Sequence, residues 1–376
     1  MTRENLLIVA DSEHDANMLY AVGFLLPDPF VYLRTGGRSC VVMDDLDVKR
    51  VRKSALDCRV IRLNTCVRKL EREGVKKPTI ARVIKTVLHE KRLKKVLVPE
   101  NFPLGLAREL RGLKIKVKAK EGMFFREREF KSAEEVKKIS AALIMAEVGL
   151  AEGIHALKNS RIGKNGRLFY HNIPLTAEKL RSIIDIATIQ AGGIANHTIV
   201  AAGSQACDPR ERGHGGICAN EAIILDVFPR SKKTGYFGDI ARTVVRGRAS
   251  EFIRRMYHAV VRAQDLVLTR VRSGSLGSQV HNAVLQFFEK EGFRTVCHNG
   301  RMEGFCHGTG RGLGLEIHEA PSIGPTSEEI LKPGHVVTIE PGLYYHGVGG
   351  VRLEDVALVT PSTPRNLTKF EKVLEV

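Results

Sequence analysis

Hydrophobic and polar positions follow two different periods along the first third of the chain. Short apolar runs alternate with longer charged stretches, in which apolar residues recur at helical spacing. The short runs predict strands and the longer stretches predict helices. The predicted strands cover residues 5–10, 40–43, 58–63, 94–99 and 113–118, and the predicted helices cover residues 47–56, 79–93 and 103–112. This alternation predicts a small α/β domain.

The pattern changes near residue 128. Ser132 and Glu135 form the S-x-x-E signature of a helix N-terminus, and apolar residues then recur at helical spacing. Further along, glycine-rich apolar runs predict a mostly antiparallel sheet covered by amphipathic helices. These strands are expected at residues 194–203, 222–228, 238–247, 336–345 and 348–360, and the helices at residues 250–271 and 276–293. We therefore expect an α/β domain over residues 1–127 and an α+β domain over residues 128–376.

The composition agrees with two such domains, because 376 residues exceed what one ordinary hydrophobic core holds. No apolar run approaches the roughly 20 residues that span a bilayer, and the first residues lack the pattern of a signal peptide. The seven cysteines are odd in number and scattered, without a CxxC motif. These features predict a cytoplasmic protein with no membrane contact, no disulfide framework and no thiolate zinc site.

The net charge of +17 is unevenly distributed, because residues 51–120 hold 21 Lys and Arg against 6 Asp and Glu. Lys114, Lys116, Lys118 and Lys120 occupy every second position and would share one face of a strand. One interpretation is a contact surface for nucleic acid or an acidic partner. The other is a solvated edge strand, where lysines discourage edge-to-edge pairing. No aromatic residues lie between the lysines, which argues against nucleic acid.

The acidic residues of the second domain suggest chemistry. Asp226 ends one apolar run and Asp239 precedes the next, with turn residues between them. The midpoint of the two lies at Lys232–Lys233, inside the turn, so the two aspartates are expected to lie opposite each other on one face of a hairpin.

Glu340 and Glu354 form a second pair of this kind, with their midpoint at Gly347. Like charges directly opposite each other destabilise a sheet, so two such pairs in one sheet need a reason. Divalent cations bound by carboxylate oxygens supply one. A carboxylate-rich cluster favours Mn, Fe or Co over a thiolate-type zinc site.

The motifs in combination resemble a known family. They are LDVFPRSKKTGYFGDIART, HGTGRGLGLEIHEAP, TIEPGLYY and VRLED. The resemblance is to the "pita-bread" metallopeptidases of family M24, in the Xaa-Pro aminopeptidase/prolidase branch. It implies a pita-bread α+β catalytic domain, preceded by a smaller creatinase-type α/β domain. It also implies hydrolysis of peptides with proline at the second position, by a homodimer.

By this resemblance, five residues hold two metal ions. Asp226 matches the first aspartate ligand, Asp239 the bridging aspartate, and Glu354 the bridging glutamate. Glu340 matches the remaining glutamate ligand, which would also carry the proton. The family's histidine ligand stands in the middle of a GHG motif, and this chain has Arg311 there. Manganese is the metal most expected, with Co, Fe or Zn as alternatives.

Other residues match substrate-binding positions of the family. His307 matches a histidine that lines the substrate pocket, and His318 matches one that contacts substrate and stabilises the tetrahedral intermediate. Arg352 matches an arginine beside the bridging glutamate. A histidine that relatives carry before the first aspartate is Arg210 here, and His214 is a candidate to replace it.

Arg311 leaves three outcomes open, because an arginine stays protonated and has no lone pair to donate to a cation. Its guanidinium occupies the vacated metal position and pairs with the acids; or Asp226, Asp239 and Glu354 hold a single metal; or Arg311 swings out and water completes a weak second site. A cation beside a cation site lowers metal affinity, so we expect one metal or none.

Three functions therefore compete. The first is a metal-dependent Xaa-Pro exopeptidase with an impaired or single-metal site. The second is a non-catalytic pita-bread protein that binds a peptide or a partner in its cleft. The third is a metal-independent hydrolase of a small amidine, like creatinase, against which the retained acids argue. A Cys306–His307 nucleophile is set aside, because neighbours on a strand point to opposite faces.

Overall fold

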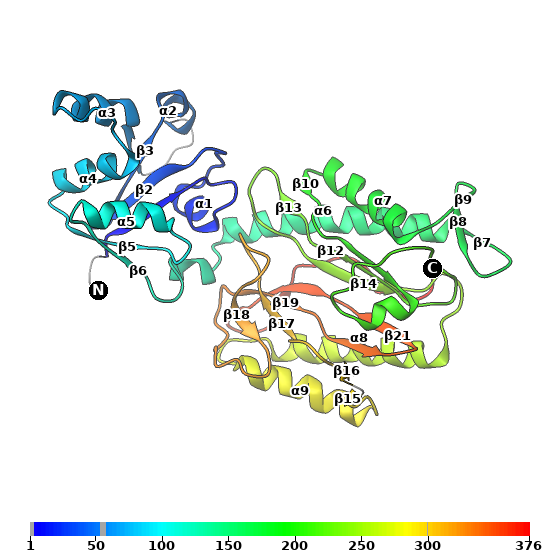
Figure 1. Ribbon diagram of the computed structural model, residues 1–376. Coiled ribbons are helices and arrows are strands. Elements are labelled where there is room, and N and C mark those ends of the chain that lie inside the picture. Colours follow the sequence, from blue (N-terminus) through cyan, green and yellow to red (C-terminus); the bar gives the residue numbers. More distant parts are fainter. Residues whose placement is uncertain (1–3, 53–57, 299) are drawn as a thin grey trace. The chain divides into compact units, whose positions relative to one another are not determined.

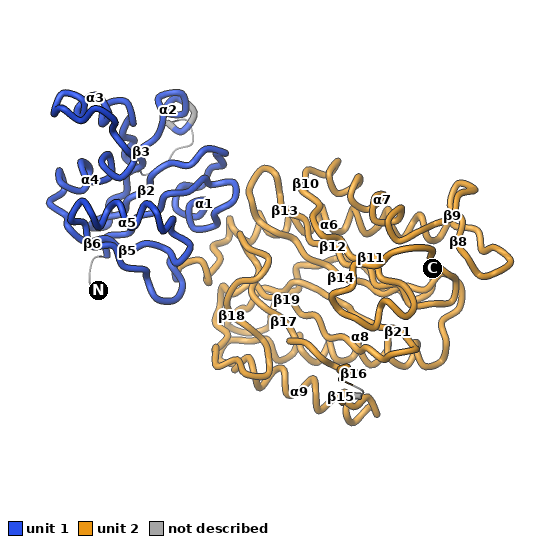
Figure 2. The backbone as a smooth tube through the Cα atoms, viewed as in Figure 1, with its two compact units in different colours: residues 1–126 blue, residues 127–376 orange. Residues whose placement is uncertain are grey.

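The computed structural model describes residues 4–52, 58–298 and 300–376. The chain divides into two compact units, Met1–Arg126 and Glu127–Val376 (Figure 2). The predicted helix over residues 47–56 is present as α2 (Asp45–Arg52), and its last residues lie outside the described part of the chain.

The first unit is a six-stranded mixed sheet with helices on both faces. Neighbouring strands β1, β2 and β3 are antiparallel, whereas β4 runs parallel to β3, and β5 and β6 run parallel to β1. In spatial order the strands are β4 (Cys58–Arg62), β3 (Arg38–Met43), β2 (Phe30–Thr35), β1 (Leu6–Ala10), β5 (Lys95–Val98) and β6 (Lys116–Ala119). Its helices are α1 (Ala16–Val22), α2, α3 (Leu63–Arg72), α4 (Ile80–Glu90) and α5 (Leu104–Gly112).

Both faces of the central strand β1 are buried, which explains its continuous apolar run. Leu7 packs in a cluster with residues of α3, α4 and α5, whereas Leu6 and Ile8 pack with residues of α1 and α2 on the other face. The sequence pattern did not predict α1, α3 or β2.

The lysine-rich segment forms the edge strand β6, in agreement with the second interpretation above. Lys116 and Lys118 are exposed and Val117 is buried. Lys114 precedes the strand and has a left-handed backbone conformation, so the strand is shorter than the alternation of lysines suggested.

The second unit places strands between two pairs of helices (Figure 1). Its helices are α6 (Ala133–Lys158), α7 (Ala177–Gln190), α8 (Glu251–Arg270) and α9 (Gly277–Lys290), after a short 3-10 turn at Arg126–Glu129. The predicted capping box begins α6: the Glu135 amide donates to Ser132 Oγ, and the Ser132 amide donates to the Glu135 carboxylate. Helix α7 was not predicted.

Two sheets of this unit carry the site. The first has the order β11 (Ile199–Ala202), β12 (Ile223–Val227) and β14 (Ile240–Val244), with α6 and α7 packed against it. The second has the order β18 (Glu319–Ile323), β17 (Gly310–Gly312), β19 (Val336–Ile339), β22 (Asp355–Leu358) and β23 (Arg365–Asn366). Residues of α8 and α9 share one apolar cluster with β19 and β22.

The remaining strands form small ribbons. A hairpin of β20 (Gly342–Tyr345) and β21 (Gly349–Arg352) extends the line of β19 and β22. The others are β7 (Arg161–Ile162), β8 (Leu168–Tyr170) and β9 (Ile173–Pro174); β10 (Gly193–Ile194) with β13 (Arg230–Ser231); and β15 (Val296–His298) with β16 (Arg301–Glu303).

Helix α6 is long and apolar enough to cross a membrane by length and composition, and it is the one such helix in the described part of the chain. Its most apolar window has a mean hydropathy of 1.4, and 44% of that window is buried inside the structure. Because the helix packs against α7 and β12, the core of this unit accounts for its apolar residues.

Candidate functional site

The acidic residues meet on one face because of how three strands are aligned. Asp226 of β12 lies directly opposite Ala241 of β14, and Ala241 in turn forms a bridge with Glu354. Residues directly opposite each other in a sheet point to the same face. Asp239 precedes Ala241 by two positions and shares that face. The expectation that Asp226 lies directly opposite Asp239 is therefore wrong by two residues in register. The two residues nevertheless lie on the same face of the sheet, as expected.

The second hairpin has the predicted register but not the predicted pair. Both β19–β22 and β20–β21 are centred on Gly347. Between them the ladder is interrupted: the Glu340 amide donates to the carbonyl of Thr309 at 2.8 Å, and the Glu354 amide donates to that of Ala241 at 3.0 Å. This interruption lets Glu354 join the first sheet while Glu340 stays with β17.

Two glycines allow the close approach of the strands that carry the site. A Cβ on Gly238, before Asp239, would lie 2.4 Å from backbone atoms of Ala142 in α6. A Cβ on Gly310, before Arg311, would lie 1.9 Å from the carbonyl oxygen of Thr338 in β19. Only glycine fits at either place, because backbone atoms cannot move aside as a side chain can.

Arg311 points its guanidinium into the acidic cluster. Nη2 donates to Asp239 Oδ2 at 2.5 Å and lies 3.8 Å from Glu354 Oε1, and Nε lies 3.8 Å from Glu340 Oε1. Burial lowers the pKa of Arg311, but the charges of these three acids outweigh burial and raise it above its usual value. The guanidinium therefore lies among the acids, as the first of the three outcomes predicts, and the number of metal ions that the site holds stays a prediction.

Within the acidic cluster, three carboxylate oxygens have no hydrogen-bond partner. They are Asp226 Oδ1, Asp239 Oδ1 and Glu354 Oε1, and all are buried. Asp226, Asp239 and Glu354 each offer one oxygen, and these three oxygens lie within 4.8 Å of one another. They are therefore close enough together to bind one metal ion. Buried unpartnered carboxylates are costly, and a divalent cation would satisfy them.

Burial controls the protonation of these acids. It raises the pKa of Asp239 to about 7, against the opposing effect of the Arg311 charge. It raises the pKa of Asp226 despite Arg352, and it raises that of Glu354 well above its usual range, with the Asp239 charge adding to the effect. Without a bound cation the cluster therefore keeps protons near neutral pH.

A second arginine fixes the other side of the cluster. Arg352 Nη2 donates to Asp226 Oδ2 at 2.6 Å, and Nη1 donates to Tyr344 Oη and to the carbonyl of Pro209, each at 3.1 Å. Tyr344 Oη lies 2.8 Å from His307 Nε2. Because His307 Nδ1 lies 2.8 Å from the Gly308 carbonyl, the hydrogen-bond network assigns the proton to Nδ1, and Nε2 accepts from the tyrosine. Sequence reasoning missed Tyr344, although the GLYY motif contains it.

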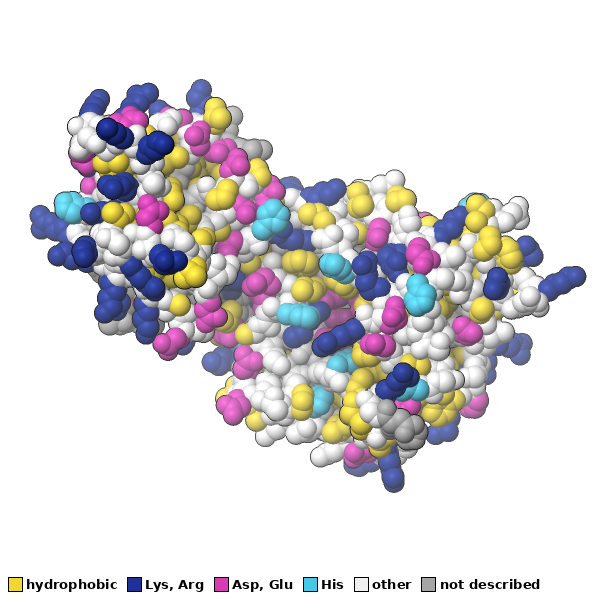
Figure 3. All heavy atoms as spheres, viewed as in Figure 1, with side chains coloured by type: hydrophobic (Ala, Val, Ile, Leu, Met, Phe, Trp, Pro, Cys, Tyr) yellow, Lys and Arg dark blue, Asp and Glu magenta, His cyan; other side chains and the backbone are white. Residues whose placement is uncertain are grey.

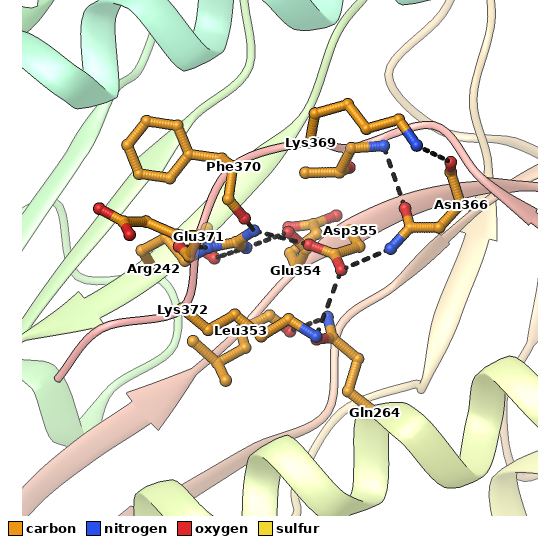
Figure 4. A network of polar contacts seen from close by, with 12 residues as sticks. Arg242, Gln264, Leu353, Glu354, Asp355, Asn366, Lys369, Phe370, Glu371 and Lys372 are labelled. Carbon is orange, nitrogen blue, oxygen red and sulfur yellow. Dashed lines mark hydrogen bonds and ion pairs between the residues drawn. The ribbon is translucent and has the colours of Figure 1, made fainter.

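Behind the cluster, a buried arginine holds the backbone that carries Glu354 (Figure 4). Arg242 Nη1 donates to the carbonyls of Ala241 and Glu354 at 2.9 and 2.8 Å. Its Nη2 donates to Asp355 at 2.8 Å, and both ends of the guanidinium also reach carbonyls of the C-terminal segment, at Phe370 and Glu371. The side chain of Arg242 is buried, so this network fixes the strand bearing Glu354 from the face opposite the acids.

A cavity of about 780 Å³ opens onto the cluster. Figure 3 shows basic and histidine side chains around a hollow with acidic side chains inside it. The cavity is lined by the predicted site residues Asp226, Asp239, Glu340, Glu354, Arg311, Arg352, His307, His318 and Arg210. His214 is not among its lining residues; its exposed ring lies 3.7 Å from Glu211.

Cys306 also lines this cavity, together with His307. The expectation that it points away is wrong, because residues 305–309 have no strand structure and do not alternate. Burial raises the pKa of its thiol, and both ring nitrogens of His307 contact other groups. These contacts argue against a cysteine nucleophile.

The chain is similar in sequence to known peptidases. The model of metallopeptidase family M24 matches residues 137–361. An uncharacterized peptidase of Bacillus subtilis is 36% identical over 156 residues, covering 42% of this chain and 41% of its own length. An Xaa-Pro dipeptidase of Pyrococcus furiosus is 33% identical over 185 residues, covering 47% and 48% respectively. The matches thus span less than half of these relatives.

Solved structures match the whole chain. An X-Pro aminopeptidase from Thermotoga maritima superposes with a TM-score of 0.83 at 21% identity, covering 100% of this chain and 98% of its own. A prolidase from Pyrococcus horikoshii superposes with a TM-score of 0.77 at 22% identity, covering 99% and 96%. The expected fold, a pita-bread domain after a smaller α/β domain, is confirmed by this likeness.

Proposed function

The chain belongs to metallopeptidase family M24, and we propose that it hydrolyses peptides with proline at the second position, as an Xaa-Pro aminopeptidase or dipeptidase. The names of similar proteins, an Xaa-Pro dipeptidase and an X-Pro aminopeptidase, support this substrate class. The observation that carries the proposal is the group of three unpartnered carboxylate oxygens, of Asp226, Asp239 and Glu354, at the floor of a cavity large enough for a short peptide.

We infer that these three residues hold one divalent cation and that Arg311 occupies the place of a second. Their oxygen donors suit a hard or borderline cation, and we propose manganese, with Co, Fe or Zn as alternatives. A cation bound there would polarise the scissile carbonyl and make water a stronger nucleophile. The positive charge of Arg311 stands beside Glu340 and Glu354, where it offsets part of their negative charge.

The remaining roles belong to side chains that face the cavity. Glu340 is proposed as the group that takes the proton from the attacking water and passes it to the leaving amine; its carboxylate accepts a hydrogen bond from Thr338 Oγ1 at 3.0 Å. His318 is exposed at the cavity and is proposed to contact the substrate; burial and the charge of Arg311 lower its pKa, so its ring is neutral near pH 7. His307 and Arg352 are proposed to orient the substrate.

The direct test is the hydrolysis of an Xaa-Pro dipeptide and a longer Xaa-Pro peptide by the purified chain with added manganese. The matched control is Glu340→Gln, which keeps the shape of the side chain and removes its proton-accepting charge. We expect release of the N-terminal residue by the natural chain and a loss of about 100-fold or more in the variant. Equal rates for both proteins would contradict the proposal.

A second candidate function is a non-catalytic peptide-binding protein. It is favoured by the ion pairs of Arg311 with Asp239 and of Arg352 with Asp226, because they offset part of the acidic charge without any metal. Binding of an Xaa-Pro dipeptide without cleavage, in the presence and absence of manganese, would support it. For the Xaa-Pro peptidase we also propose a cytoplasmic location and a homodimer. Analytical ultracentrifugation of the purified chain would test the homodimer.

A further inference from the structure

The strand that follows His318 begins with a buried ionic cluster outside the acidic site. Glu319 Oε1 accepts from Arg128 Nη2 at 2.6 Å, and Glu319 Oε2 accepts from Lys131 Nζ at 2.8 Å. The side chains of Glu319 and Lys131 are each 2% exposed, and that of Arg128 is 6% exposed. Burial raises the pKa of Glu319, but the two cations outweigh burial and lower it below its usual value.

The same carboxylate also holds the connection between β17 and β18. The backbone amides of Leu315 and Glu316 donate to Glu319 Oε1 at 2.9 and 3.1 Å. Gly314 leaves the room for this, because a Cβ there would lie 2.6 Å from Glu319 Oε2. The Glu319 carboxylate therefore connects the loop of residues 313–318 to two cations. This loop starts two residues after Arg311 and ends with His318.

The cations come from a segment far away in the sequence. Arg128 lies in the 3-10 turn at the start of the second unit, and Lys131 precedes the capping residue of α6. The Lys131 amide also donates to the Gly334 carbonyl at 2.8 Å, just before β19. The beginning of the second unit is thus fastened at two places: to Glu319, directly after His318, and to Gly334, just before β19.

We propose that Glu319 is a positioning residue that, through Arg128 and Lys131, holds the loop 313–318 and so places His318 in the cavity. The effect on catalysis rests on the proposed function, whereas the effect on the loop does not. A buried carboxylate with two cations and two amides is costly to leave half-satisfied, so the loop keeps one conformation only while all partners are in place.

The test compares Glu319→Gln with Glu316→Gln. Glu316 also contacts Arg128, at 2.6 Å, but its side chain is 56% exposed and it does not bind Lys131. Both variants change the charge equally.

We expect Glu319→Gln to speed hydrogen exchange of the Leu315 and Glu316 amides by about tenfold or more, to move the NMR signals of the His318 ring, and to lower turnover at unchanged metal content. Glu316→Gln should change none of these. Lys131→Met should act in the same direction and serves if the first variant does not fold.

The outcomes separate the two proposals. Unchanged exchange and unchanged His318 signals in Glu319→Gln would overturn the positioning role, whether or not the chain is an enzyme. Faster exchange with the turnover of the folded chain unchanged would also overturn it, because the cluster would then be purely structural. If the natural chain hydrolyses no Xaa-Pro peptide, the proposed function fails, and the exchange and NMR results still decide the role of Glu319.

Discussion

Two arginines reach into the same acidic cluster, and they are held very differently. Arg352 donates to Asp226, Tyr344 and the carbonyl of Pro209, and its backbone exchanges hydrogen bonds with Thr243. Arg311 makes one side-chain hydrogen bond, to Asp239, while its Nε and Nη1 are buried without a hydrogen-bond partner. Arg352 therefore belongs to the framework of the site, whereas Arg311 occupies a space that the framework does not fit closely.

Because of this difference, we expect Arg352 to matter mainly for stability and Arg311 mainly for metal binding. Arg352 has one buried donor without a partner, its Nε, but both of its terminal nitrogens are bonded, so its removal would leave several buried groups unsatisfied. Arg311 has two donors without hydrogen-bond partners, so its replacement should cost less unfolding free energy. The acids that remain would be suited to binding a cation. Substitutions of each arginine in turn, and then of the groups around them, test this difference.

The largest effect on stability is expected for Arg352→Met. It leaves Asp226 buried without its ion pair and Tyr344 without its donor, which costs about 3–5 kcal/mol in unfolding free energy. The matched variant is Arg311→Met, which should cost clearly less, because the pKa of Asp239 of about 7 lets it take up a proton instead. Thermal unfolding of both metal-free variants compares them. A larger loss for Arg311→Met would contradict the framework role of Arg352.

The largest effect on metal binding and peptide cleavage is expected for Arg311→His. An imidazole can donate a lone pair, so this variant should bind a second metal ion and cleave Xaa-Pro peptides about tenfold faster or more. Arg311→Met serves as its control, because it removes the charge and offers no comparable ligand. Elemental analysis and peptide hydrolysis give the readouts. If the histidine and methionine variants behave alike, Arg311 does not stand at a ligand position.

Metal affinity should depend on pH through Asp239. Its pKa is raised to about 7 in the metal-free fold, so below that pH a proton must leave before a cation binds. Through Asp239 alone, affinity should rise up to about tenfold per pH unit from pH 5, and this contribution should level off above pH 7. The sign for stability is opposite: between an unfolded pKa of about 3.9 and the folded value, the folded metal-free chain holds the extra proton, so its unfolding free energy falls as pH rises.

Titration calorimetry in buffers of different ionisation enthalpy measures the proton released on metal binding. Thermal unfolding of the metal-free chain across the same pH range measures the stability. Metal affinity that stays constant from pH 5 to pH 7 would show that Asp239 is ionised without the cation.

The smallest effect is expected for Tyr344→Phe. It removes the hydroxyl between Arg352 and His307 and should cost about 1 kcal/mol of stability. The NMR signals of the His307 ring should show loss of the hydrogen bond at Nε2, while metal content stays the same. An unchanged His307 spectrum would mean that the tyrosine does not fix this ring.

The sequence predicted which acids belong together, because each follows or precedes an apolar run and turn residues separate them. It placed Asp226 and Asp239 two residues out of register, because the spacing alone does not reveal the short strand β13 between them. It also paired Glu340 with Glu354, where the ladder is in fact interrupted and Glu354 bridges to Ala241. Local patterns carry no information about such a change of sheet.

Contacts between distant segments were beyond sequence reasoning for a similar reason. Arg128 and Glu319 are 191 positions apart, and neither lies in a motif that suggests an ion pair. Tyr344 is one of two adjacent tyrosines, and only the strand direction shows that it faces inward while Tyr345 is partly exposed. The resemblance to a family identified ligand positions, but the partners that orient them depend on packing.

The number of metal ions that each chain binds shows whether Arg311 stands in place of a second ion. The natural protein would be incubated with manganese, freed of unbound ion and measured by elemental analysis. We predict one ion, held by Asp226, Asp239 and Glu354, with Arg311 in place of the second. Two ions per chain would show that Arg311 leaves the site when metal binds, and none would show that the three unpartnered oxygens do not form a metal site.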